Sequence, residues 1–123
     1  MTAMAVVCRI IMDKRRDEKV LGGIERIKAD PPAWSPTAVD FMYCFLGSLA
    51  LYQSGGGDCR TFRAWHGSAV ALLEQHQAAD GSWEPIDRWS FAGGPVYATA
   101  INVLTLLTET RPCPIFVKKP ARD

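Results

Sequence analysis

The chain alternates between two kinds of predicted helix, and this alternation limits its fold more than any single motif does. Three stretches contain at most one charged residue each: 2–12, 38–52 and 95–108. Nearly uncharged helices are typical of segments buried on most sides. Between them, residues 18–28 and 61–76 have apolar side chains at helical spacing on one face and polar or charged ones on the other. We therefore predict an all-α fold of about five helices, ordered inner, outer, inner, outer, inner.

Proline and glycine mark the predicted helix ends. Asp30-Pro31-Pro32 ends the second helix, because proline has no amide hydrogen and disfavours helical geometry in the residue before it. Ser35 as an N-cap, with Pro36 at the first helical position, starts the third helix. Gly55-Gly56-Gly57 ends that helix, and Gly93-Gly94-Pro95 opens the last one. Gly22 and Gly23 weaken the second helix, which indicates either the close approach of a neighbouring helix or an accident of sequence.

A short pattern of small and apolar residues recurs in the three inner helices. It comprises Thr2–Val6, Ser48–Tyr52 and Thr99–Val103, which lie 46 and 51 residues apart. A period near fifty residues that agrees with an alternation of helix type predicts a helical repeat. We assign residues 1–110 to one repeat domain. Residues 111–123 form a C-terminal tail, because three prolines prevent the helix from continuing.

Charge and hydropathy exclude several classes of partner. The formal charge of +1 provides no broad positive surface for nucleic acid. The positive residues at 14–16 follow the first apolar run, whereas a secretory signal has them before it. The low-charge run Ala38–Ser54 is shorter than the roughly 20 residues that a membrane span needs. We predict a cytoplasmic protein with no membrane span and no nucleic acid partner.

The four cysteines do not indicate a metal site. Cys8, Cys44, Cys59 and Cys113 form no Cys-x-x-Cys pair and lack the close spacing that zinc sites use. Cys8 and Cys44 fall within apolar helical runs, where a free cysteine behaves as a small hydrophobic residue. We predict that the cysteines are reduced.

The sharpest motif lies between the fourth and fifth helices and consists of Leu73, Gln77, Gly81 and Trp83, with Ser82 before the tryptophan. It resembles the Gln-Trp repeat of the squalene cyclase and protein prenyltransferase superfamily. The similarity continues through Asp87-Arg88-Trp89, Gly93-Gly94, Val96-Tyr97 and Thr99-Ala100. The resemblance implies an α/α toroid, a ring of paired helices. Leu72 replaces the aromatic residue that usually precedes the motif leucine, and there is one clear copy.

The motif has a physical role as a joint between two helices. Gln77 can form hydrogen bonds with backbone groups left unpaired at a helix end. Asp80-Gly81 permits a turn, and the ring of Trp83 can cover the amide of Gln77 while it buries a large apolar area. In the superfamily this joint tightens the ring.

The catalytic groups of related enzymes are absent. Class II terpene cyclases use an acid of the form Asp-x-Asp-Asp or Asp-x-Asp-Thr, and complement-type toroids carry a Cys-Gly-Glu-Gln thioester; neither occurs. Prenyltransferases bind zinc through Asp-x-Cys and a distant histidine, whereas Asp58 and Cys59 are adjacent, with His66 and His76 further along. We assign no catalytic residue, metal or cofactor, and expect both histidines at the surface or rim.

Four polar or aromatic residues remain as binding candidates: Asp87, Arg88, Trp89 and Asn102. Asp87 and Arg88 could position a ligand, or form a loop salt bridge or helix cap. Trp65, Trp83 and Trp89 could line a groove or act as packing anchors. Asn102, in an uncharged helix, would be costly to bury unpaired, so we expect a backbone or water partner. It is also a candidate for the inner surface of a ring.

The predicted toroid is incomplete. A closed ring of this superfamily has about six helix pairs, whereas this chain provides two and a half, so both end helices should expose apolar flanks. The chain is then the end of a longer protein, a self-associating remnant or a partner-dependent piece, and the tail with Pro112, Pro114 and Pro120 favours a C-terminal piece. The expected partners are further copies or the remainder of a longer toroid. Two functions follow as hypotheses: a non-catalytic scaffold or interaction domain, or a fragment of an isoprenoid enzyme that contributes an apolar cavity wall for a hydrophobic isoprenoid ligand.

Overall fold

The computed structural model describes residues 1–13, 16–35, 39–55 and 59–110. They form five α-helices and a final 3-10 turn, with no strand in these ranges. The elements are α1 (Thr2–Asp13), α2 (Glu18–Ala29), α3 (Phe41–Gly55), α4 (Arg60–Gln75), α5 (Ser90–Leu106) and η1 (Leu107–Thr110). The predicted all-α fold is confirmed. The predicted tail, residues 111–123, lies outside the described ranges, as do Pro36, Gly56, Gly57 and Asp58.

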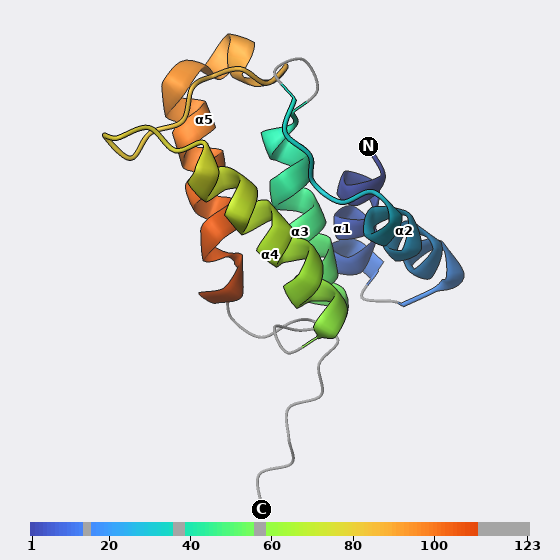
Figure 1. The fold of residues 1–123 in the computed structure, drawn as a ribbon. Coiled ribbons are helices and arrows are strands. Elements are labelled where there is room, and N and C mark those ends of the chain that lie inside the picture. The colour runs from blue at the N-terminus through green and yellow to red at the C-terminus, as the bar shows by residue number, and fades with distance from the viewer. Residues whose placement is uncertain (14–15, 36–38, 56–58, 111–123) are drawn as a thin grey trace, which may run out of the picture.

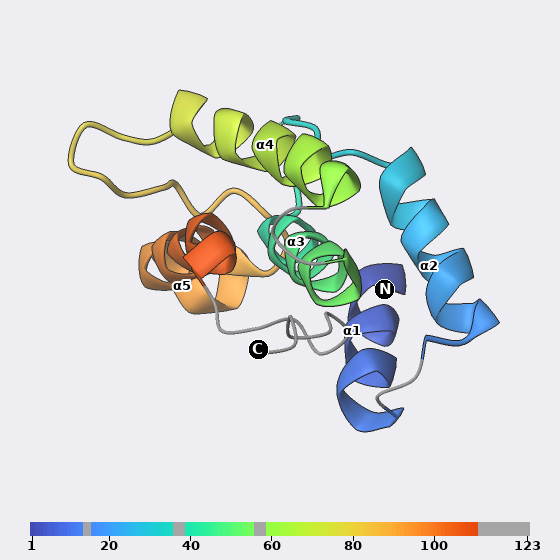
Figure 2. The same cartoon turned by 90° about the horizontal axis from the view of Figure 1, so that it is seen from below.

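The helices lie in two layers. Seen from below, α1, α3 and α5 lie side by side in one layer, and α2 and α4 lie in the other (Figure 2). In Figure 1, α1, α3 and α5 run downward and α4 runs upward, whereas α2 lies oblique to them. Helix α3 contacts α1, α4 and α5, whereas α2 packs chiefly on α1 and α4 chiefly on α3. Odd-numbered helices therefore form one layer and even-numbered helices the other.

Burial differs between the middle and the ends of the odd-numbered layer. Helix α3 has no exposed residue, as predicted for an inner helix. The prediction of burial on most sides is wrong for α1 and α5, each of which buries one face only. Their buried sets share the same helical spacing: Ala3, Val6, Val7 and Ile10 in α1, and Ala98, Ile101, Asn102 and Thr105 in α5. The reason is position, since α3 has a neighbour on each side within its layer.

The helix ends agree with most of the proline and glycine signals. Helix α2 ends at Ala29, directly before the predicted stop at Asp30-Pro31-Pro32. Gly94 has φ of +62°, which interrupts α5, so the long segment of this helix begins at Pro95 as predicted. Helix α3 begins at Phe41, and the predicted start at Pro36 lies outside the described residues. The carboxylate of Asp40 accepts a hydrogen bond from the Tyr43 amide at 2.8 Å, so Asp40 caps this helix.

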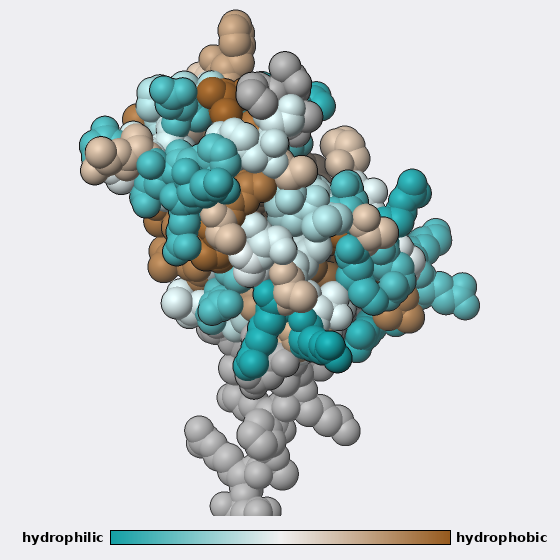
Figure 3. All heavy atoms as spheres, viewed as in Figure 1, coloured by the Kyte–Doolittle hydropathy of each residue, from teal (hydrophilic) through white to brown (hydrophobic). Residues whose placement is uncertain are grey.

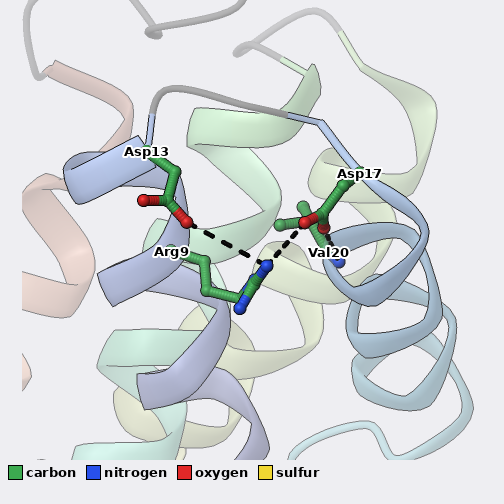
Figure 4. A network of polar contacts seen from close by, with 4 residues as sticks. All are labelled: Arg9, Asp13, Asp17 and Val20. Carbon is green, nitrogen blue, oxygen red and sulfur yellow. Dashed lines mark hydrogen bonds and ion pairs between the residues drawn. The ribbon is translucent and has the colours of Figure 1, made fainter.

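One ion pair ties the start of α2 to α1. The Arg9 guanidinium donates to the Asp17 carboxylate at 2.6 Å, and the same carboxylate accepts from the Val20 amide at 2.9 Å (Figure 4). Asp13 lies 4.0 Å from the same guanidinium nitrogen. The hydrogen bond from Arg9 lowers the pKa of Asp17. Asp17 therefore acts both as the N-cap of α2 and as a link between the two layers.

Two glycines let helices approach closely. A Cβ atom on Gly23 would lie 2.3 Å from Cγ2 of Val6, and one on Gly47 would lie 2.4 Å from the ring of Trp65. These contacts join α2 to α1 and α4 to α3. The suggested close approach is thus found at Gly23, whereas a Cβ on Gly22 would meet nothing within 4 Å.

Candidate functional site

The four motif residues form one joint between α4 and α5. Trp83 is 1% exposed, and its indole nitrogen donates to the backbone oxygen of Leu73 at 2.9 Å. Gln77 donates from Nε2 to the oxygen of Gly81 at 2.8 Å, and Gly81 has φ of +85°. The Trp83 amide donates to Oγ1 of Thr99 at 3.4 Å, which connects the loop to α5. The Leu73 carbonyl, in the last turn of α4, also accepts from the His76 amide at 3.2 Å, so the indole of Trp83 is its second donor.

Helix α2 ends on a similar contact. The indole nitrogen of Trp65 donates to the backbone oxygen of Ile27 at 2.9 Å, and the Tyr43 hydroxyl donates to the oxygen of Asp30 at 2.7 Å. Both helices of the even-numbered layer thus end on a buried tryptophan. Trp65 and Trp83 are buried and act as packing anchors. Trp89 is 40% exposed and remains a candidate for ligand binding.

Asp87 is a cap shared by two helices. It is 4% exposed, and its carboxylate accepts from the amides of Phe41 at 3.3 Å and Ser90 at 2.9 Å, and also from the Ser90 hydroxyl. The neighbouring Arg88 points its guanidinium over the Trp89 ring, 4.7 Å from the centroid. The two residues therefore have separate roles, and the geometry of Asp87 is that of a structural cap.

A groove lies at one end of the molecule, between the start of α1, the end of α2 and the start of α3. Its volume is about 760 Å³. Apolar lining comes from Met1, Met4, Met42, Leu46 and Trp89, and charged lining from Arg26, Asp30 and Asp40. Methionine side chains adapt to ligands of different shape. The groove therefore presents apolar side chains beside two carboxylates and one guanidinium.

His66 lies inside the molecule, so its predicted place at the surface or rim is wrong. It is 1% exposed, its Nδ1 lies 2.9 Å from Oγ of Ser48, and its ring stacks on Phe62 at 4.9 Å. Nε2 has no hydrogen-bond partner among the described residues and lies 3.9 Å from Oε1 of Glu109. Burial lowers the pKa of His66, and Glu109 opposes this shift.

His76 is half-buried at the end of α4, in agreement with the predicted rim position. Its ring stacks on Trp34 with centroids 3.7 Å apart, and its Nδ1 lies 2.8 Å from the backbone oxygen of Leu72. The two histidines therefore lie in different environments and share no site.

Three polar residues of α5 and η1 are also fully buried. The hydroxyls of Thr105 and Thr108 donate to the backbone oxygens of Ile101 and Leu104. Asn102 is 0% exposed, and neither Oδ1 nor Nδ2 has a hydrogen-bond partner in the described part of the chain. The expected backbone partner is thus not found there. Buried polar groups of this kind are commonly paired by ordered water.

The sequence contains a signal that His66 is buried, although we did not predict it. His66 lies at helical spacing from Phe62, Ala69 and Leu73, all of which are 0% exposed. A stripe drawn through Phe62, Ala69 and Leu73 includes position 66, whereas we expected this histidine at the surface or rim. Ser48, Thr105 and Thr108 carried no comparable signal, because small hydroxyl residues occur on both faces of helices.

The chemistry available to these groups is limited by access. Ser48, His66 and Glu109 contain the residue types of a nucleophile, a base and an orienting acid. Ser48 is 0% exposed, however, so no substrate reaches its hydroxyl in this conformation. Within the described residues, no group of three His, Cys, Asp or Glu side chains could hold a metal ion. The geometry is that of a structural polar core.

Among the described segments, one passes the length and hydropathy test for a membrane span, Ser90–Thr110. Core helices of soluble proteins can pass the same test, and this segment is interrupted at Gly94 and packs against α3. The predicted absence of a membrane span stays a prediction.

Comparison with known proteins identifies no family for this chain. A scan against protein-family models and searches of curated proteins and of solved structures gave no match. The likeness to cyclase and prenyltransferase repeats therefore rests on the sequence motif.

Proposed function

We propose that this chain is a non-catalytic interaction domain built from repeats similar to those of squalene cyclases and protein prenyltransferases. In this proposal the odd-numbered helices form the inner layer of an incomplete α/α toroid. The layer continues through contacts with further copies or with further repeats of the same kind. Two features support the proposal: the alternating layers, and a tryptophan-anchored joint at the end of each even-numbered helix.

The observation that carries the proposal is the uncovered apolar surface at both ends of the odd-numbered layer. Helix α1 exposes Ile11 by 53% and Met12 by 80%, and the α5 end exposes Val96 by 81% and Leu107 by 47%. Figure 3 shows apolar side chains gathered on the side occupied by α5. Apolar side chains that gather on an exposed surface mark interaction sites more often than scattered ones do.

Sedimentation velocity over a wide range of protein concentration tests this proposal. We expect the mean sedimentation coefficient to rise with concentration, because association removes the exposed apolar side chains from water. A protein that stays strictly monomeric at high concentration and melts cooperatively would contradict self-association.

The groove favours a second candidate function, a piece of an isoprenoid enzyme that contributes an apolar wall. Trp89 lines this groove and is the only exposed tryptophan of the four. A polyprenol that binds there should quench tryptophan fluorescence in the unmodified protein and much less in Trp89→Phe. Equal quenching in both proteins, or none in either, would remove the support that the groove gives to this candidate.

A further inference from the structure

The buried ring of His66 has one nitrogen that is paired and one that faces an acid. Nδ1 lies 2.9 Å from Oγ of Ser48, whereas Nε2 has no hydrogen-bond partner among the described residues. Oε1 of Glu109 lies 3.9 Å from Nε2. This distance is too long for a hydrogen bond, for which a nitrogen and an oxygen approach to about 3 Å. The two groups therefore face one another without bonding.

The two residues differ in how firmly they are held. His66 belongs to α4, and its side chain is 1% exposed and stacks on Phe62. Glu109 belongs to η1, the short turn that follows α5, and its side chain is 60% exposed. The turn η1 packs on α3 and α5. Because the carboxylate is partly in solvent, it can approach the imidazole, whereas the imidazole is fixed by packing on both sides.

A proton on His66 changes what Nε2 requires. A neutral imidazole has one N–H group and one acceptor nitrogen, whereas an imidazolium has two N–H groups. Oγ of Ser48 suits Nδ1 in both forms, because a hydroxyl can donate or accept. The N–H group at Nε2 then needs an acceptor, since a buried donor without one is costly. The carboxylate of Glu109 is the acidic group that faces it, so protonation should draw Glu109 inward.

The groups around His66 come from three elements, and one of them is charged. Helix α3 presents the hydroxyl of Ser48, α4 presents the ring of Phe62, and η1 presents the carboxylate of Glu109. Burial lowers the pKa of His66, and Glu109 raises it. Proton uptake by the folded protein therefore depends on how closely this carboxylate approaches.

We propose that His66 and Glu109 form a proton-controlled latch between α4 and η1, which is open when the imidazole is neutral and closed when it carries a proton. In the open state η1 is held by its packing on α3 and α5. In the closed state the N–H group at Nε2 also donates to Glu109, so η1 is tied to α4 as well. The latch goes beyond the interaction function proposed above and does not depend on it, because both residues belong to one chain.

An NMR titration of the imidazole nitrogens tests the role of the carboxylate. Glu109→Gln removes the charge and keeps the length of the side chain, and we expect it to lower the pKa of His66 by about 0.5 or more. Glu84→Gln makes the same change at an exposed position in the loop between α4 and α5, and should leave this pKa unchanged. The latch is overturned if Glu109→Gln has no effect, or if the imidazole stays neutral until the protein unfolds.

Amide hydrogen exchange tests whether η1 is held more firmly once the proton is bound. Exchange of the amides of Leu107–Thr110 is compared above and below the measured pKa of His66, after correction for the intrinsic exchange rate at each pH. We expect their protection to rise about threefold in the acidic sample, which is the scale of a partly exposed ion pair. Glu109→Gln should abolish this rise, and Glu84→Gln should keep it. Equal protection above and below the pKa in the unmodified protein would show that η1 does not close.

Discussion

Asp87 fixes the relative position of two helices with a single carboxylate. Its three hydrogen bonds reach the first amide of α3 and both the amide and the hydroxyl of Ser90 at the start of α5. The sequence showed that a cap was one role open to Asp87, because carboxylates near helix starts often cap them. It could not show that one residue serves two helices, since Phe41 lies far from Asp87 in the chain.

Asp87→Ala should lower the free energy of unfolding by about 2 kcal/mol, because it removes a cap and leaves buried donors unpaired. Chemical denaturation measures the change. Asp80→Ala is a suitable control, since Asp80 is exposed and bonds only within its own turn, to Ser82. A loss no larger than that of the control would show that the shared cap contributes little.

His66 should make stability depend on pH. Burial lowers its pKa in the folded state below the 6.5 of an ordinary histidine, so the unfolded chain binds the proton more readily. Stability should therefore fall as pH drops through about 6.5, and level off once the folded state also binds the proton. Urea titrations between about pH 8 and 5 measure this. His66→Gln should show a shallower decline, and identical profiles would contradict the prediction.

At the scale of the helix, hydrophobic periodicity and the prolines and glycines at helix ends predicted the five helices. They did not predict every residue that caps them. All five helices exist, and the stops at Pro31 and the start at Pro95 are in place, because proline and glycine act locally. The cap of α3 by Asp40 was not predicted, because Asp40 lies inside an apolar run, and the predicted start at Pro36 lies outside the described residues.

Gly22 and Gly23 provide a matched test of helix packing. Gly23→Ala should lower the free energy of unfolding by about 1–3 kcal/mol, because the added methyl group overlaps Val6. Gly22→Ala should raise it by about 0.5–1 kcal/mol, since alanine favours helix and this site is open. Thermal and urea unfolding of both variants compares them directly. Effects of the same sign would show that α1 and α2 do not pack as described.

At the scale of the molecule, the order of the helices predicted two layers. The burial of each helix face depends on which other helices lie beside it. Uncharged sequence indicated that α1, α3 and α5 should be covered, yet only α3 is covered on both sides. The partial exposure of α1 and α5 agrees with the apolar flanks expected for an incomplete array, as at Met12 and Val96. The buried polar group around His66 was not predicted, because it arises where α3, α4 and η1 meet.

The position of Cys44 in α3 makes this thiol an internal reporter of how the molecule opens. Cys44 is 2% exposed, and burial raises its pKa to about 12, so alkylating reagents react with it only after α3 separates from its neighbours. The backbone amide of Phe62 lowers the pKa of the more accessible Cys59, which should react early, while Cys8 is exposed. Mass spectrometry after pulses of iodoacetamide would therefore time the opening of the central helix at residue resolution.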